Sequence, residues 1–276
     1  MKYVRVAVVL SGGGAKTAAH LGALKALEEW QLAPSRYVGT SMGAVVAACF
    51  ASGLGYDEIL KRVVGITRRD VAVPAAGALL GPFGRTVLRA APLVQTIGRL
   101  VPARTFEELT CPITVSATDA ESGDLVLFGA GGRSDVSLHE ALYASCALPM
   151  YYPPAVIDGR SYMDGGIRAV LPLRIAAAEH PDLVYAVYAG PSLRVQTPVR
   201  PDRLRVLGAH DNAVRILMAA QADAEVAAWD ERVPLVLVRP VLDGRATFAV
   251  DNAIRYVEEG YRAAVEALER WKKGRE

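Results

Sequence analysis

A serine between two glycines, at the end of a strand-like run, constrains this chain more than any other feature. The run Tyr37–Gly43 ends in Gly-x-Ser-x-Gly and passes directly into a small, apolar, helix-forming segment, residues 42–52. A serine in a sharp strand-to-helix turn is strained so that its Oγ is exposed, and Gly39 and Gly43 leave room for the turn. The helix would also direct its N-terminal N–H groups at that Oγ. The pattern predicts a nucleophile elbow with Ser41 as the nucleophile; an ordinary Gly/Ser turn is the alternative.

A glycine-rich loop precedes this turn. Residues 4–10 are nearly all apolar and mostly β-branched, which is typical of a strand buried on both faces of a parallel sheet. The run stops at Ser11 and the glycines 12–14, and a helix to about residue 30 follows, with leucines every three residues on one face. Such a loop presents bare backbone N–H groups to an anion, as a phosphate cradle or as an oxyanion hole.

Spacing separates these two chemistries. A Walker loop needs Gly directly before Lys-[Ser/Thr], but Ala15 precedes Lys16, and a dinucleotide fingerprint needs a small residue where Thr17 stands. The oxyanion hole remains. A right-handed βαβ crossover would place this loop beside Ser41, because the carboxyl ends of adjacent parallel strands meet at one edge of a sheet. We therefore expect backbone N–H groups of Gly12, Gly13, Gly14 and Met42 to form the hole.

The middle of the chain holds a less regular region and a second candidate side chain. Residues 57–103 are apolar and punctuated by Gly and Pro, which favours a helical cap with an acyl pocket. The alternative is a mobile lid or membrane-contacting surface between residues 71 and 100. A Ser-x-x-Glu capping box is predicted at 137–140, and residues 156–162 read as a hairpin with an Asp-Gly turn. The hairpin leads to Asp164-Gly165-Gly166, which suits a carboxylate on a tight turn but also fits a plain turn.

The remaining pattern predicts an α/β fold with a mostly parallel central sheet in a single domain, residues 1–276. Core strands are expected at 112–117, 125–128, 183–189 and 233–238, and a helix at about 211–228. A C-terminal helix would begin at Asp251 as N-cap and bury one face. That face is formed by Ile254, Val257, Tyr261, Val265 and Leu268.

Composition narrows the class of protein. The chain of 276 residues is 52% hydrophobic and 22% charged, and its 31 basic and 29 acidic side chains give a net charge of +2, which does not favour a nucleic-acid partner. Cys49, Cys111 and Cys146 lack metal-ligand spacing and are expected to be free, buried thiols. No run reaches the length of a membrane-spanning helix, so we expect a cytoplasmic protein, with peripheral membrane contact left open. We expect no metal and no cofactor; the oligomeric state is not indicated.

Four motifs together resemble the patatin-like phospholipase family. They are Gly12-Gly13-Gly14-Ala15-Lys16, Gly39-Thr40-Ser41-Met42-Gly43, Ala144-Ser145-Cys146-Ala147-Leu148-Pro149 and Asp164-Gly165-Gly166, in this order and spacing. The resemblance covers residues 4 to about 190 and implies a three-layer α/β/α lipid acyl hydrolase of the phospholipase A or lysophospholipase type. It implies that Ser41 is the nucleophile, Asp164 its base and residues 12–14 the oxyanion hole. Lys16 stands where the family carries Arg or Lys, whereas Thr17 replaces a frequent Gly; residues 195–276 are interpreted from their pattern alone.

Other functions stay open at this point. The elbow indicates acyl chemistry without identifying the leaving group, so an esterase, a thioesterase or an acyltransferase for soluble acyl groups is the main alternative. A non-catalytic lipid- or nucleotide-binding module would keep the glycine loop as an anion site. A Ser-His-Asp triad would need one of the four histidines, and only His210 loosely fits the required order.

Overall fold

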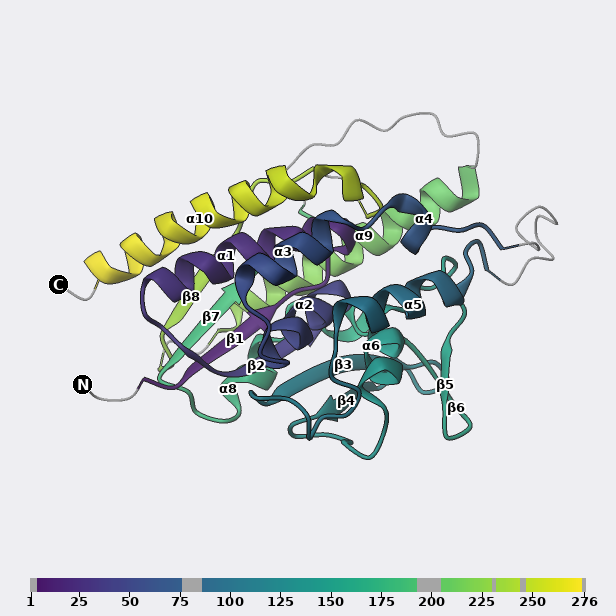
Figure 1. The fold of residues 1–276 in the computed structure, drawn as a ribbon, viewed down its shortest axis with the longest axis horizontal. Coiled ribbons are helices and arrows are strands. Elements are labelled where there is room, and N and C mark those ends of the chain that lie inside the picture. Colours follow the sequence, from purple (N-terminus) through teal and green to yellow (C-terminus); the bar gives the residue numbers. More distant parts are fainter. Residues whose placement is uncertain (1–3, 76–85, 193–204, 230–231, 244–246, 275–276) are drawn as a thin grey trace.

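A mixed sheet of eight strands forms the centre of the protein in the computed structural model, which describes residues 4–75, 86–192, 205–229, 232–243 and 247–274 (Figure 1). The strand order within this part of the chain is β5-β6-β3-β2-β1-β7-β8, and β4 pairs with β3 outside that path. The strands are β1 (Val6–Leu10), β2 (Pro34–Thr40), β3 (Ile113–Asp119), β4 (Leu125–Gly129), β5 (Ala155–Ile157), β6 (Arg160–Asp164), β7 (Leu183–Val187) and β8 (Leu235–Val238).

The parallel half of the sheet is the half that the apolar runs predicted. Strands β3, β2, β1, β7 and β8 pair in parallel, and all five residues of β1 are buried. The run β1–α1–β2 is the expected βαβ unit, because β1 and β2 are adjacent and parallel and the helix α1 (Ala18–Glu29) connects them. The hairpins β3–β4 and β5–β6 are antiparallel. The second one was predicted, and it turns at Asp158 and Gly159, both with positive φ.

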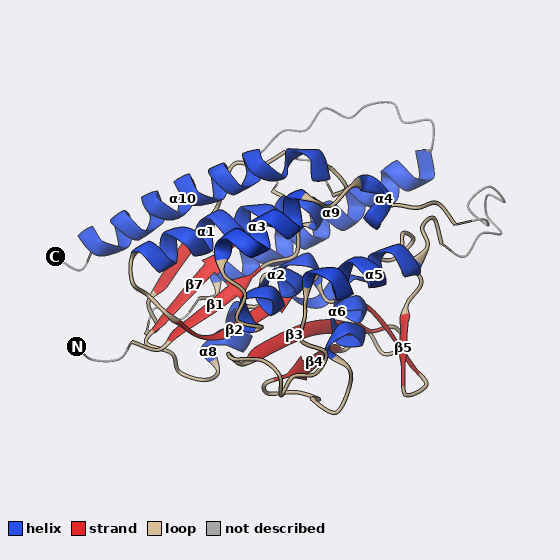
Figure 2. Cartoon of the chain, in the orientation of Figure 1, coloured by secondary structure: helices blue, strands red, loops and turns tan. Residues whose placement is uncertain are grey.

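Helices cover both faces of the sheet, which confirms the three-layer arrangement (Figure 2). Alternate residues of β1 point into two separate hydrophobic clusters: Val6, Val8 and Leu10 into one, Ala7 and Val9 into the other. The larger cluster contains residues of α1, α2 (Met42–Ala51), α3 (Tyr56–Val64), α5 (Ala90–Leu100), α6 (Leu138–Cys146) and α10 (Ala253–Lys273). The smaller one contains residues of α8 (Leu173–Ala177) and α9 (Arg205–Ala227).

Strand β3 connects the two halves of the sheet. Its residues 114–118 pair with β4 along one edge. Along the other edge, Tyr37–Thr40 of β2 pair with residues 113–116, and β6 takes over at Ala117. Thr40 therefore lies opposite Ser116, and Asp164 lies opposite the next residue, Ala117. This register places the ends of β2 and β6 next to each other.

Helix α10 packs so closely against α1 that two of the contact positions have no room for a side chain. A Cβ added to Gly22 of α1 would lie 1.9 Å from the carbonyl oxygen of Val257, and one added to Gly260 of α10 would lie 1.9 Å from that of Ala19. The predicted buried face is therefore partly wrong: Val257 and Leu268 are buried, but Ile254 is 48% exposed. The glycines set which side of α10 faces α1.

The predicted helix start at Asp251 is also wrong. Residues Val250–Asn252 form a 3₁₀ turn, and α10 begins after Asn252, whose side chain makes no capping hydrogen bond.

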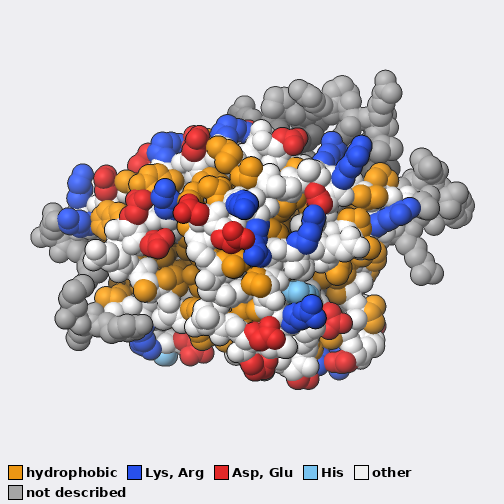
Figure 3. Space-filling view, viewed as in Figure 1, with side chains coloured by type: hydrophobic (Ala, Val, Ile, Leu, Met, Phe, Trp, Pro, Cys, Tyr) orange, Lys and Arg blue, Asp and Glu red, His pale blue; other side chains and the backbone are white. Residues whose placement is uncertain are grey.

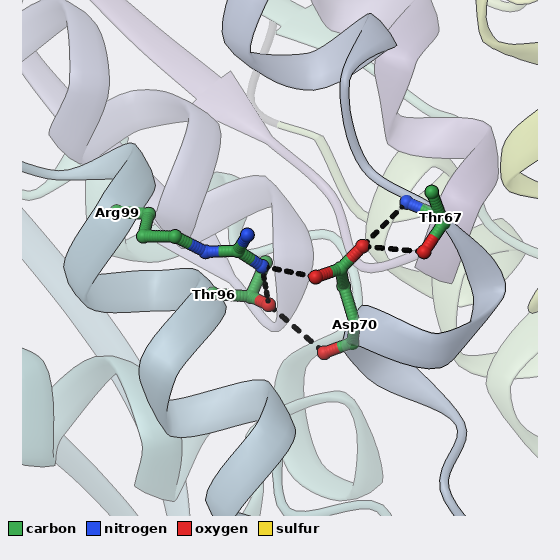
Figure 4. A network of polar contacts seen from close by, with 4 residues as sticks. All are labelled: Thr67, Asp70, Thr96 and Arg99. Atoms are coloured by element: carbon green, nitrogen blue, oxygen red, sulfur yellow. Dashed lines mark hydrogen bonds and ion pairs between the residues drawn. The ribbon is translucent and has the colours of Figure 1, made fainter.

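The predicted capping box at residues 137–140 does not form. Helix α6 begins after Ser137, but the Ser137 side chain makes no capping hydrogen bond. The complete box lies instead at Thr67 and Asp70, around the short helix α4 (Arg68–Val71). There the Thr67 N–H and hydroxyl both donate to Asp70 Oδ2, and Arg99 of α5 pairs with Asp70 Oδ1 (Figure 4). These bonds tie α4 to α5 within the region predicted to be a cap.

The region 57–103 is helical in the part that the structure describes. Helices α3 and α5 pack against α1, α2 and α6, and α4 packs against α5. Residues 76–85, the centre of the predicted lid, lie outside the described residues. None of the helices described is both long and apolar enough to cross a membrane. On the face drawn in Figure 3, basic and acidic side chains are interspersed. Of the three cysteines, Cys49 and Cys146 are buried free thiols, but Cys111 is only partly buried, which corrects that expectation.

Candidate active site

Ser41 lies at the turn between β2 and α2 with the strained backbone that the sequence predicted. Its φ of 55° and ψ of −137° are unusual for a residue with a side chain. Both flanking glycines are required by close backbone contacts. A Cβ on Gly39 would lie 2.5 Å from Ala44 Cα, and one on Gly43 would lie 2.3 Å from Ser11 O. The turn is therefore compressed against both its own helix and the glycine loop.

Ser41 and Asp164 are joined by a direct hydrogen bond. The Ser41 hydroxyl donates to Asp164 Oδ2 at 2.7 Å, and the Gly166 N–H donates to the other carboxylate oxygen, also at 2.7 Å. The side chains of Ser41 and Asp164 come from the adjacent ends of β2 and β6. A Cβ on Gly165 would lie 2.2 Å from Ser116 O, so only glycine allows this turn to approach β3. The geometry is that of a nucleophile with a base oriented by a backbone N–H.

The carboxylate of Asp164 is in a dry environment. Only 3% of Asp164 is exposed, and this burial raises its pKa to about 6 although the hydrogen bonds from Ser41 and Gly166 act in the opposite direction. A carboxylate with a pKa near 6 is ionised at neutral pH and is a stronger base than an exposed aspartate. Burial thus brings Asp164 closer to the pKa range of a general base.

The glycine loop lies beside Ser41. A Cβ on Gly12 would lie 3.4 Å from Ser41 Cβ, but the Gly12 N–H donates to Val170 O at 3.1 Å and so points away from an oxyanion. Within the described residues, the N–H groups of Gly13, Gly14 and Met42 have no hydrogen-bond partner. Gly13 precedes a 3₁₀ turn, Gly14 begins it and Met42 begins α2, so these donors are available to a ligand. Of the four predicted donors, Gly12 is therefore occupied, and an oxyanion hole formed by the other three stays a prediction.

None of the four histidines, all of them described, forms a hydrogen bond with Ser41 or Asp164. His20 is fully buried, its Nε2–H donates to Ser11 O, and burial lowers its pKa to about 4, so the ring is neutral. His139 Nε2 is bonded to Val101 O, and His180 is exposed in a loop. His210 of α9 lines the cavity described below without any hydrogen bond to the two reactive side chains.

A cavity of about 730 Å³ opens on these groups. Ser41, Asp164 and the loop residues 12–14 form part of its wall. Apolar side chains from α2, α3, α5 and the segment after α6 line much of the rest. They include Val45, Val46, Cys49, Val63, Ile66, Val71, Leu93, Leu100, Leu148 and Tyr152. A strained serine paired with a buried carboxylate therefore faces an apolar chamber.

Comparison with known proteins identifies the family. A family model described as patatin-like phospholipase matches residues 8–177, which contain the glycine loop, Ser41 and Asp164. The chain belongs to the patatin-like phospholipase family. Residues beyond 177, including α9 and α10, complete this patatin-like fold outside the matched segment.

Relatives of this patatin-like protein are longer than the chain. An uncharacterized NTE family protein of Mycobacterium tuberculosis is 32% identical over 79% of the chain, which spans 59% of that relative's length. The human omega-hydroxyceramide transacylase is 32% identical over 60% of the chain and 31% of its own length. The crystal structure of VipD from Legionella pneumophila aligns with 97% of the chain and 67% of its own length, with a TM-score of 0.52 and 16% identity, which shows the shared fold.

The end of α6 contributes to this patatin-like site, although no role for its residues was predicted from the sequence. The end of α6 holds both reactive residues: Ser145 Oγ accepts the Ser41 N–H at 2.7 Å, and Ala147 O accepts the Asp164 N–H at 3.0 Å. Ser145 O also accepts the Gly165 N–H. The run 144–149 was part of the family resemblance, but its pattern alone indicates only a helix end.

Lys16, which follows the glycine loop, was also predicted to belong to the site. It is only 5% exposed, its Nζ donates to Gly190 O at 3.3 Å, and it lines the cavity. Burial lowers its pKa to about 8, with opposing contributions from the charges of Asp243 and Arg215. A lysine this deeply buried is unusual in a patatin-like or any other domain unless its charge has a partner.

Proposed function

We propose that the protein is a serine hydrolase of the patatin-like family that cleaves acyl esters of lipids through a Ser41-Asp164 dyad. The observation that carries this proposal is the 2.7 Å hydrogen bond from the strained Ser41 to a buried carboxylate in the wall of a large apolar cavity. Helices α9 and α10 pack on the same sheet as the matched segment, so we treat the chain as one catalytic domain.

The proposed first half-reaction follows from these contacts. Asp164 Oδ2 takes the proton of the Ser41 hydroxyl as Oγ attacks the ester carbonyl. The N–H groups of Gly13, Gly14 and Met42 bind the oxyanion that forms, in a site from which water is largely excluded. The tetrahedral intermediate collapses, the proton passes from Asp164 to the leaving alcohol, and an acyl-Ser41 ester remains.

Water completes the reaction by the same route. Asp164 deprotonates a water molecule that attacks the acyl-Ser41 carbonyl, and the same three N–H groups stabilise the second oxyanion. Collapse of this intermediate releases the fatty acid and returns the proton from Asp164 to Ser41 Oγ. No step requires a metal ion, because the base and the oxyanion donors are provided by the chain.

The acyl chain would lie along α2. Met42, Val45, Val46 and Cys49 line the cavity at a spacing that places them on one face of this helix. From Ser41 to Cys49 the helix rises by about 12 Å. This apolar wall favours an acyl chain over a compact polar group, which supports a lipid ester over a small soluble ester. The acyl pocket is therefore assigned to α2 together with α3 and α5 rather than to residues 71–100 alone.

Acyl transfer is the second candidate. One relative is named a transacylase, and the acyl-Ser41 ester is common to hydrolysis and to transfer. The two differ only in whether water or an alcohol attacks that ester. Addition of a long-chain alcohol to the assay distinguishes them, since transfer would yield an alkyl ester in place of the free fatty acid.

Active-site labelling tests the proposal. A fluorophosphonate should label the wild type and fail to label Ser41→Ala, because the probe bonds to the nucleophile oxygen. The rate of hydrolysis should fall on the order of 10⁶-fold in the same variant. Ser52→Ala is the matched control: Ser52 follows α2, its hydroxyl donates to Ala48 O, and labelling should persist. Hydrolysis of p-nitrophenyl esters of increasing chain length should rise from C4 towards medium chains. Absence of labelling in the wild type would instead favour a non-catalytic binding module.

A further inference from the structure

Two cations line the cavity beside the proposed dyad, and their charges are unpaired. Among the described residues, no carboxylate oxygen lies within 4.0 Å of Lys16 Nζ or of the Arg215 guanidinium. Lys16 donates to Gly190 O, and Arg215 donates to Ser192 O at 3.3 Å and to Asn212 Oδ1 at 3.1 Å. The Arg215 Nε is buried without any hydrogen-bond partner. Removing cations from water without an anion is costly, and no described acidic residue pairs with these two side chains, so a bound anion would stabilise both.

The two cations lie close to each other. Both donate to carbonyl groups of the same short segment, Gly190–Ser192, and the charge of Arg215 acts on the pKa of Lys16. The acid that acts on Lys16, Asp243, is already engaged by the Tyr256 hydroxyl and by Arg255.

Two further carboxylates, Asp211 and Asp251, also line the cavity. Neither acts on the pKa of Lys16, and Asp211 accepts a hydrogen bond from the Tyr151 hydroxyl. Asp243 acts on Lys16 only through its charge at a distance, and no described carboxylate forms an ion pair with either cation.

Helix α9 positions Arg215 close to Asp164. Met218, one turn further along α9, touches the catalytic turn: a Cβ on Gly166 would lie 2.7 Å from its Cε. One turn beyond that, Gln221 accepts the Val170 N–H and donates to Ile167 O, so α9 is fixed to the segment that follows Asp164. Arg215 is about 5 Å along the helix from Met218, the residue that touches the turn after Asp164. Lys16 follows the glycine loop that lies beside Ser41.

We propose that Lys16 and Arg215 form an anion subsite that binds a phosphate group next to the ester that Ser41 attacks. A guanidinium presents its N–H donors in a fork that matches phosphate oxygens, and a lysine adds a point charge. The phosphate is either carried by the lipid itself or bound as the free ion. The lipid case rests on the proposed hydrolysis, whereas binding of the free ion does not.

A matched pair of lipids tests the lipid case. Lysophosphatidic acid and monoacylglycerol with the same acyl chain differ by one phosphate, so the ratio of their kcat/KM values isolates its contribution. We expect the wild type to favour the phosphorylated lipid at least about tenfold, since a charge-assisted hydrogen bond contributes that much. Arg215→Gln should lower this ratio about tenfold, and Arg215→Lys should lower it less. Arg270→Gln, an exposed charge on α10, should leave the ratio unchanged.

Inorganic phosphate tests the subsite without any turnover. Millimolar phosphate, compared with chloride at equal ionic strength, should raise the melting temperature of the wild type and of Arg270→Gln but not of Arg215→Gln. A phosphate shift without lipid preference would assign the subsite to the free ion. The proposal is overturned if the wild type shows neither effect, or if Arg215→Gln keeps both. Failure of fluorophosphonate labelling would refute the proposed hydrolysis while leaving the phosphate shift as a valid test.

Discussion

Replacing Asp164 by Asn should abolish activity and at the same time stabilise the fold at neutral pH. Asparagine has nearly the same shape, its Oδ1 can accept the Gly166 N–H, and its Nδ2 can donate to Ser41 Oγ, so both hydrogen bonds of Asp164 have a substitute. What Asn lacks is the charge that burial disfavours. It also cannot accept the proton of Ser41, so the rate should fall by at least about 10⁴-fold.

The pKa of Asp164 gives the size of the stabilisation. Burial raises that pKa from 3.8 to about 6, two units that correspond to at most about 3 kcal/mol. Because the folded-state pKa is the higher one, the folded protein holds the proton more tightly than the unfolded chain. The wild type therefore loses this stability as pH rises from about 4 through 6, and the Asn variant does not. Above pH 6 the variant should be more stable by up to about 3 kcal/mol, or about 5 °C in a chain of this size.

Thermal or urea unfolding at pH 7.5 and at pH 4.5 measures both the gap and its pH dependence. The gap between Asp164→Asn and wild type should be largest at pH 7.5 and should shrink at pH 4.5. Asp124→Asn, at an exposed position in the β3–β4 turn, serves as the control and should show no such gap. If Asp164→Asn destabilises the protein at pH 7.5, or if the gap does not shrink on acidification, Asp164 is not a desolvated carboxylate and the argument for its role as base fails.

Three further predictions follow from the same contacts. For a soluble ester, kcat/KM should be constant above pH 6 and should fall about tenfold per pH unit below it, because activity needs the ionised Asp164. A profile that stays constant down to pH 5, or an inflection that moves in His210→Gln, would contradict a lone aspartate base. Gly13→Val should lower turnover at least about 10²-fold, because its Cβ would lie 2.5 Å from Ala189 O and displace a proposed oxyanion donor. Gly12→Ala should retain most of the turnover, and equal turnover in both variants would show that the loop has only a structural role. Gly22→Ala should lower the free energy of unfolding by at least about 2 kcal/mol, because α10 would have to move. Gly55→Ala should not, because the space around Gly55 is open, and urea titrations of the two variants measure this difference.

Elements that depend on local residue patterns could be predicted before the fold was known. The apolar run of β1, the strained serine turn and the Asp158-Gly159 hairpin all formed as expected, because burial periodicity and turn chemistry are properties of neighbouring residues. The glycine loop was also placed correctly next to Ser41, since a βαβ unit has only one favourable handedness. The family motifs added the pairing of Ser41 with Asp164, which no local pattern contains.

Long-range contacts determine which polar groups within those elements lack a hydrogen-bond partner. Gly12 and Gly13 are alike in sequence, yet the N–H of Gly12 is used by Val170 O, a residue more than 150 positions away. Ser137 has the sequence of a capping box and makes no capping bond, whereas Thr67 forms the box that was not predicted.

The relation between Lys16 and Arg215 is of the same long-range kind. The two residues are 199 positions apart by their numbers, and the docking of α9 beside the catalytic turn places them on one cavity. Periodicity shows that a face is buried but not what buries it, because that depends on which strand edges and helix faces meet. The register of β3 places the end of β2 beside the end of β6, and this brings the turn at Ser41 and the turn at Asp164 together.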